Sequence, residues 1–196
     1  MTTENLIVQV TVGLMLIALL ILAGIAGYRR WLRHRARGQL LRSFEASSAA
    51  LLKDVLLPDG SGGLLHIDFL LLTGRGLLVV DFRDAAGIVF GGEHMREWAV
   101  MNGNERSTFL NPLETLYDRV AAVKALAGDV PVEGRIIFTE RATFPKGRPP
   151  HVLRLASLEV EYPPPQPGVS PHPAERWRAA WEELLAQCEP SPLGRH

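Results

Sequence analysis

The chain has 196 residues, of which 47% are hydrophobic, and its 21 basic and 21 acidic residues give a formal net charge of zero. This length allows one membrane segment and one modest domain, and the neutral balance argues against a protein that coats nucleic acid through a broadly basic surface. The single cysteine, Cys188, excludes an intramolecular disulfide and is typical of a protein in a reducing compartment.

An uncharged apolar run extends from Leu6 to Gly27. A helix of this length crosses a hydrocarbon core of roughly 30 Å, so residues 1–28 are predicted to be a transmembrane helix with a short N-terminus. A signal peptide is not expected, because Glu4 precedes the run and the positive charge follows it. That positive charge is an arginine cluster over residues 29–37, formed by Arg29, Arg30, Arg33, Arg35 and Arg37. By the positive-inside rule it places the following domain in the cytoplasm, anchored to the inner (cell) membrane by a single pass.

After the arginine cluster the charge balance is acidic. From position 38 onward there are 16 basic and 20 acidic residues, a formal charge of −4 (16 − 20). Composition divides this part into a domain over 38–160, an extended proline-rich linker over 161–173, and an amphipathic C-terminal helix and tail over 174–196. The C-terminal helix is expected either to dock on the domain or to bind a protein partner.

Apolar periodicity and the intervening turn residues predict an α/β domain. In chain order the expected elements are a helix over 39–52; strands over 54–57, 64–73, 76–80, 87–90 and 98–101; a helix over 112–127; a strand over 135–139; and a strand or short helix over 152–158. The second helix has clear end signals, because Asn111 can cap it, Pro112 suits its first position and Gly128 stops it. The strands over 64–73 and 76–80 share a glycine-containing turn and are predicted to form a hairpin.

Each strand of this hairpin is associated with an aspartate, Asp68 within the first and Asp81 directly after the second. A buried carboxylate is costly without a partner, so two aspartates on neighbouring apolar strands predict a cation near them, either a divalent metal or an arginine. Arg83 lies two residues beyond Asp81 and therefore on the same face of the strand. Arg83 is therefore the candidate for an arginine that serves as the cation near the two aspartates.

An ordered set of motifs between roughly residues 36 and 140 resembles the nuclease-related domain (NERD) family. The set comprises Ile67-Asp68, Gly76, Asp81-Phe82-Arg83, Gly87-Ile88, Trp98 and Asn111-Pro112. The resemblance implies a restriction-endonuclease-like α/β fold, a mixed sheet flanked by helices, and a relation to the PD-(D/E)xK nucleases. It also implies metal-dependent cleavage of DNA or RNA, in which Asp68 and Asp81 are catalytic ligands of Mg²⁺. Arg83 occupies the position of the lysine that orients or activates water.

Four positions depart from the family pattern. Arg83 replaces the lysine, and a guanidinium does not give up its proton to act as a base. Gln39 replaces a glutamate of the metal site, Glu114 replaces a glutamine, and Asp81 is one methylene shorter than the usual glutamate. Two hypotheses remain open: an altered metal site in a nuclease, or a structural Asp–Arg ion pair in a catalytically inactive, membrane-tethered binding or scaffold domain.

Other polar residues have two interpretations each. His66 lies two residues before Asp68 on the same strand face, where it is either a metal ligand or, more commonly for such a position, a hydrogen-bonded structural histidine. Four basic residues could either contact phosphate or form a solvated rim: Arg135, Arg141, Lys146 and Arg148.

Overall fold

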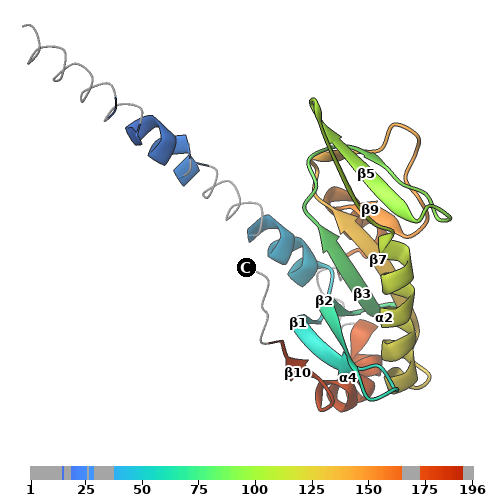
Figure 1. Cartoon of the computed structure of the whole chain (residues 1–196). Helices are drawn as coiled ribbons and strands as arrows, with labels where there is room; N and C mark the ends of the chain where they lie inside the picture. The colour runs from blue at the N-terminus through green and yellow to red at the C-terminus, as the bar shows by residue number, and fades with distance from the viewer. Residues whose placement is uncertain (1–14, 16–18, 26, 29–37, 165–172, 192–196) are drawn as a thin grey trace, which may run out of the picture. The chain divides into compact units, whose positions relative to one another are not determined.

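The computed structural model describes Met15 and residues 19–25, 27–28, 38–164 and 173–191 (Figure 1). The chain divides into two compact units, Met1–Arg42 and Ser43–His196. In the first unit the described residues are helical. Much of the predicted transmembrane segment, and the whole arginine cluster, lie outside the described residues. No helix among the residues that are described is long and apolar enough to cross a membrane.

The second unit is an α/β domain with two mixed sheets flanked by helices. The large sheet has the strand order β10-β1-β2-β3-β7-β9, and the small sheet has the order β6-β5-β4-β8. The strands are β1 (Ala50–Pro58), β2 (Leu64–Thr73), β3 (Gly76–Arg83), β4 (Gly87–Phe90), β5 (Glu97–Asn102), β6 (Glu105–Leu110), β7 (Val132–Phe138), β8 (Ala142–Thr143), β9 (Val152–Arg154) and β10 (Glu189–Pro190). The helices are α2 (Pro112–Ala127), η1 (Leu155–Ser157), α3 (Leu158–Glu161), η2 (Pro173–Trp177) and α4 (Arg178–Leu185).

The predicted central hairpin is confirmed. Strands β2 and β3 are antiparallel, with Phe69 opposite Val80, and β7 then pairs with β3 in parallel. The turn depends on Gly76, whose φ is 126° and at which a Cβ atom would lie 2.2 Å from the carbonyl oxygen of Pro131. Because an L side chain rarely adopts that φ and has no space there, only glycine suits this position.

Helix α2 covers one face of the large sheet (Figure 1). It begins as predicted, since the Oδ1 atom of Asn111 accepts a hydrogen bond from the Leu113 N–H at 3.1 Å. The helix approaches β7 closely at Gly134, where a Cβ atom would lie 2.6 Å from Cγ2 of Val120. Alternation along β3 directs Leu77 and Val79 toward this helix, so the next residue in the alternation, position 81, faces it too.

Some predicted boundaries were wrong. The first helix ends at residue 46, not 52, and β1 begins at Ala50, because the apolar residues 50–52 pair with β2. Strand β7 begins at Val132, three residues before the predicted start. Strand β6 was not predicted, because its sequence ERSTFL has little apolar periodicity and is extended by its pairing with β5.

The C-terminal segment docks on the domain, which was one of its two predicted roles. Trp181 and Leu184 of α4 are buried in the core beside α2. Strand β10 then adds to the outer edge of β1. The proline-rich residues 165–172 lie outside the described part of the chain.

Candidate functional site

Asp81 lies at the C-terminal end of β3, on the face of the large sheet that α2 covers. Its side chain is completely buried, with 0% exposure, although a carboxylate is expensive to remove from water. The same alternation that buries Leu77 and Val79 therefore carries a charged group into the core.

Two arginines hold the Asp81 carboxylate. Nη1 of Arg119, on α2, donates a hydrogen bond to Oδ2 at 2.6 Å, and Nη2 of Arg83 donates to the same oxygen at 2.9 Å. Nε of Arg83 also lies 2.6 Å from Oδ1. The Arg119 side chain is 11% exposed and that of Arg83 is 34% exposed. The Asp81 charge is thus neutralised by Arg83, two residues further along the same strand, and by Arg119 on α2.

Asp68 lies on the neighbouring strand and has its own partners. Its Oδ2 atom accepts a hydrogen bond from the backbone N–H of Phe82 at 3.0 Å, which attaches it to β3. Nδ1 of His66 lies 3.3 Å from the Oδ1 atom of Asp68, and Nε2 of His66 lies 3.5 Å from Asp54. His66 therefore lies between two carboxylates of β1 and β2, an arrangement compatible with its structural interpretation.

The pKa of Asp81 is raised above its ordinary value. Burial is the largest cause and raises the pKa, the guanidinium groups of Arg83 and Arg119 lower it, and the nearby Asp68 carboxylate raises it. The net upward direction means that removal from water outweighs ion pairing, which is common for buried salt bridges. The Asp68 carboxylate lies close to Asp81, because it hydrogen-bonds to the N–H of Phe82, the next residue along β3.

The raised pKa of Asp81 predicts how the stability of the folded domain depends on pH. A raised pKa in the folded state means that Asp81 contributes most stability below the unfolded-chain pKa of about 3.9, and that this contribution is lost as pH rises through the folded-state pKa. Asp81→Asn cannot ionise, so the melting temperature of the wild type relative to this variant should fall as pH rises above about 4. Thermal unfolding across that range measures it, and Asp84→Asn, at a half-exposed aspartate, is the matched control. Parallel pH profiles for wild type and Asp81→Asn would contradict the expectation.

The residues around Asp81 do not fit a divalent cation. Both carboxylate oxygens already have guanidinium nitrogens within 3 Å, and two aspartates with two arginines give a formal charge of zero without a metal. Among the described residues, no group of three or more histidine, cysteine and acidic side chains is placed to hold a metal ion. Of the other family positions, Glu114 is exposed on α2, and Gln39 belongs to the N-terminal unit.

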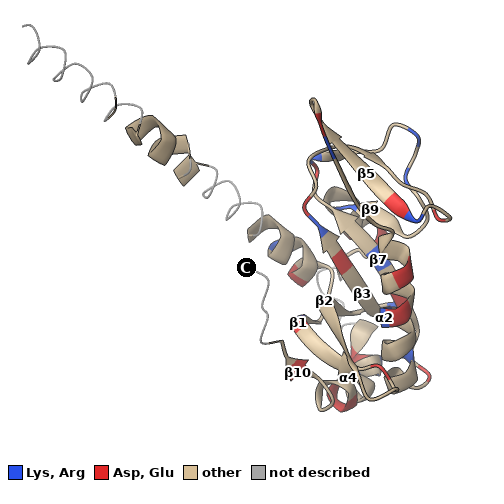
Figure 2. Cartoon of the chain, in the orientation of Figure 1, with Lys and Arg blue, Asp and Glu red and all other residues tan. Residues whose placement is uncertain are grey.

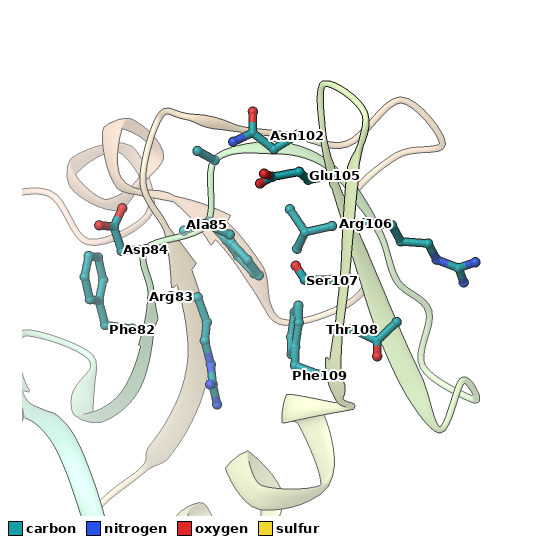
Figure 3. Close-up of a pocket in the computed structure, with 13 residues that line it drawn as sticks. Phe82, Arg83, Asp84, Ala85, Asn102, Glu105, Arg106, Ser107, Thr108 and Phe109 are labelled. Atoms are coloured by element: carbon teal, nitrogen blue, oxygen red, sulfur yellow. The ribbon is translucent and has the colours of Figure 1, made fainter.

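A cleft of about 780 Å³ lies next to this ion-paired cluster (Figure 3). One wall is the end of β3 and the residues after it, and the opposite wall is the β5–β6 hairpin of the small sheet. Arg83 links the cleft to the cluster, because it lines the cleft and also pairs with Asp81; its guanidinium lies 5.9 Å from the ring centre of Phe109. The cleft and the ion-paired cluster therefore share one residue, Arg83.

The four basic residues considered for phosphate contact behave differently. Arg135 is 15% exposed and hydrogen-bonds to Glu161 at 2.7 Å and to Glu133 at 3.0 Å, so it does not form a solvated rim. Arg141 pairs with Asp84, and Lys146 lies 5.8 Å from the ring centre of Phe90. Figure 2 shows basic and acidic residues interspersed over the visible face of the domain.

The sequence prediction missed Arg119. The signal was nevertheless present, because Arg119 lies three residues after Leu116 and next to Val120 on the apolar side of a well-predicted helix. A charged residue in such a position either reaches solvent or finds a buried partner. The structure shows the second outcome, with a partner 38 positions away in sequence.

Comparison with known proteins identifies the domain. The nuclease-related domain matches residues 30–139, more than half of the chain, and the matched region includes Asp68, Asp81, Arg83 and Arg119. It ends before β8, so the C-terminal part with α4 and β10 lies outside the match. No curated protein and no solved structure gives a significant match. With its central hairpin, its Asp81–Arg83 motif and the capped helix α2 inside the matched region, this chain belongs to the nuclease-related domain (NERD) family.

Proposed function

We propose that this NERD-family protein is a catalytically inactive, membrane-tethered binding domain. The observation that supports the proposal is the Asp81 carboxylate, which is completely buried and hydrogen-bonded to Arg83 and Arg119. A group that ligates magnesium must be able to offer its oxygens to the ion. Asp81 instead offers them to two permanent cations, one of which occupies the position of the family's lysine.

The membrane tether is proposed from the N-terminal sequence. Residues 6–27 carry no charge, and five arginines follow between positions 29 and 37. This pattern is typical of a single-pass helix in the inner (cell) membrane whose following domain lies in the cytoplasm. A tethered binding domain gains effective concentration toward partners at the same membrane, which suits a scaffold without chemistry of its own.

The competing candidate is a magnesium-dependent nuclease of the PD-(D/E)xK type acting on DNA or RNA. The proximity of Asp68 to Asp81 favours it, because two adjacent carboxylates are the arrangement from which such a metal site is built. In that case Asp68 and Asp81 would ligate the ion, and Arg83 would orient water or stabilise charge on the phosphate.

Metal titration tests the proposal. Isothermal calorimetry of the full chain in detergent micelles, with magnesium or manganese chloride as titrant, is expected to give no saturable heat. Neither wild type nor Asp68→Ala should cleave single-stranded DNA, duplex DNA or RNA, because the two arginines already neutralise Asp81. Asp59→Ala, which removes an exposed aspartate in the β1–β2 loop, is the control for nonspecific metal binding.

The opposite result is equally specific. Saturable binding and cleavage that are both lost in Asp68→Ala and both retained in Asp59→Ala would overturn the proposal and establish the nuclease.

A further inference from the structure

The edges of the two sheets differ in length. Three of them are formed by strands of two or three residues, namely β10, β9 and β8, whereas the fourth is the six-residue strand β6. A long, unpaired strand edge is a template for pairing with another chain, and proteins commonly avoid it by shortening or covering the edge. In the described part of the chain, β5 is the only strand that pairs with β6.

The hydrogen-bonding register shows which backbone groups of β6 are directed outward. The Asn111 N–H donates to the Arg96 carbonyl at 2.9 Å, and the hairpin turns at Asn102 and Glu105. Hydrogen-bonded and non-hydrogen-bonded residue pairs alternate in an antiparallel ladder. The backbone N–H and C=O groups of Glu105, Ser107 and Phe109 are therefore directed toward β5. The N–H and C=O groups of Arg106 and Thr108 are consequently directed away from β5, at the free edge.

This free edge borders the cleft. Five consecutive residues of β6, 105–109, line it. In Figure 3 the side chains of Glu105, Ser107 and Phe109 point toward the cleft, while those of Arg106 and Thr108 point away. Backbone N–H and C=O groups lie in the plane of a sheet, across the direction of its side chains, so the outward groups of Arg106 and Thr108 lie along the rim of the cleft.

We infer that the free edge of β6 binds an extended peptide segment of a partner protein, which adds to the small sheet as a further strand. The cleft favours this occupant over a second folded domain, because its opposite wall, residues 82–86, leaves a space of about 780 Å³. Backbone pairing with Arg106 and Thr108 holds the segment, and the side chains that it places on the same face as Glu105, Ser107 and Phe109 lie over the cleft.

The charges of the cleft specify the kind of segment. Asp84 is paired with Arg141, and Arg83 is paired with Asp81. Among the described lining residues this leaves the Glu105 carboxylate, which points into the cleft in Figure 3, while the Arg106 side chain points away. The segment therefore carries a basic side chain opposite Glu105 and an apolar one near Phe109 and Phe138. This inference rests on the proposed binding function and names the class of its ligand.

A displayed library of random octapeptides tests the inference against the full chain in lipid nanodiscs. Selected peptides should bind Thr108→Val as they bind wild type and should bind Thr108→Pro at least tenfold more weakly. Proline removes the outward N–H and is tolerated at strand edges, so the β5–β6 pairing is preserved. Methylation of alternate peptide nitrogens should abolish binding, and amide hydrogen exchange at Arg106 and Thr108 should slow when peptide is bound.

Three results would overturn the inference. The first is a selection that enriches no peptide. The second is peptide binding that neither Thr108→Pro nor nitrogen methylation weakens. The third is a protein that binds no peptide but self-associates, with the self-association abolished by Thr108→Pro. If Thr108→Pro lowers the melting temperature, its weaker binding could come from loss of folding. In that case the binding of nitrogen-methylated peptides to the wild type decides whether the peptide pairs through its backbone. Metal-dependent cleavage by a protein that still binds peptides at β6 would refute the proposed function and leave this assignment intact.

Discussion

Replacing Arg119 by alanine is expected to lower the free energy of unfolding by about 3 kcal/mol, the lower end of the range for breaking a buried ion pair, because Arg83 still compensates the buried Asp81 carboxylate in part. Arg119 is nearly buried, and its hydrogen bond to Asp81 is short at 2.6 Å. Arg83→Ala should cost less, about 1–3 kcal/mol, since the Arg83 side chain is one-third exposed and Arg119 would remain. Urea denaturation of the full chain in micelles measures both values.

A second substitution separates the charge effect from loss of packing. Adding Asp81→Asn to Arg119→Ala removes the carboxylate charge that has lost one of its two cations, so the double variant should be more stable than the sum of the single effects predicts, by about 0.5–3 kcal/mol. Arg178→Ala is the control, because its pair with Glu175 is on the surface, where ion pairs contribute little to stability. Strict additivity, or an Arg119→Ala effect as small as that of Arg178→Ala, would contradict the role given to Arg119.

Trp98→Ala is expected to destabilise the domain by about 3–5 kcal/mol, the usual cost of removing a fully buried large aromatic side chain. Trp98 is 0% exposed, and its ring stacks on Phe138 of β7 with centres 6.4 Å apart and an interplanar angle of 11°. Its Nε1 atom donates a hydrogen bond to the Gly92 carbonyl at 3.1 Å. This one side chain therefore joins the small sheet to the large one, and its loss should be visible in chemical denaturation.

Trp98→Phe is the matched variant. It retains the aromatic contact with Phe138 and loses the hydrogen bond and part of the ring, so it should retain well over half of the stability that Trp98→Ala loses. Peptide binding at β6 should weaken in Trp98→Ala, because the hairpin that carries the edge is no longer held against β7. Equal stability of the alanine variant and wild type would show that the small sheet does not depend on this contact.

Local signals predicted the central elements well. Helix α2 begins at Pro112 and ends before Gly128 because the cap, the proline and the stopping glycine all act within a few residues of the chain. The β2–β3 hairpin was predicted for a similar reason, since its turn and its two apolar runs are adjacent in sequence. The failures lie where pairing with a distant strand decides the conformation, as in β6 and in residues 50–52.

The sequence by itself determined that Asp68 and Asp81 lie on neighbouring strands, and that Arg83, two residues after Asp81, lies on the same strand face. The first follows from the hairpin turn between two adjacent apolar runs, and the second from the period of two in a β-strand. The tertiary structure decided what these charges do, because the second cation comes from Arg119 on α2 and reaches Asp81 only when that helix packs against β3. The free edge of β6 is likewise a tertiary result, since it depends on which strands find partners and which do not.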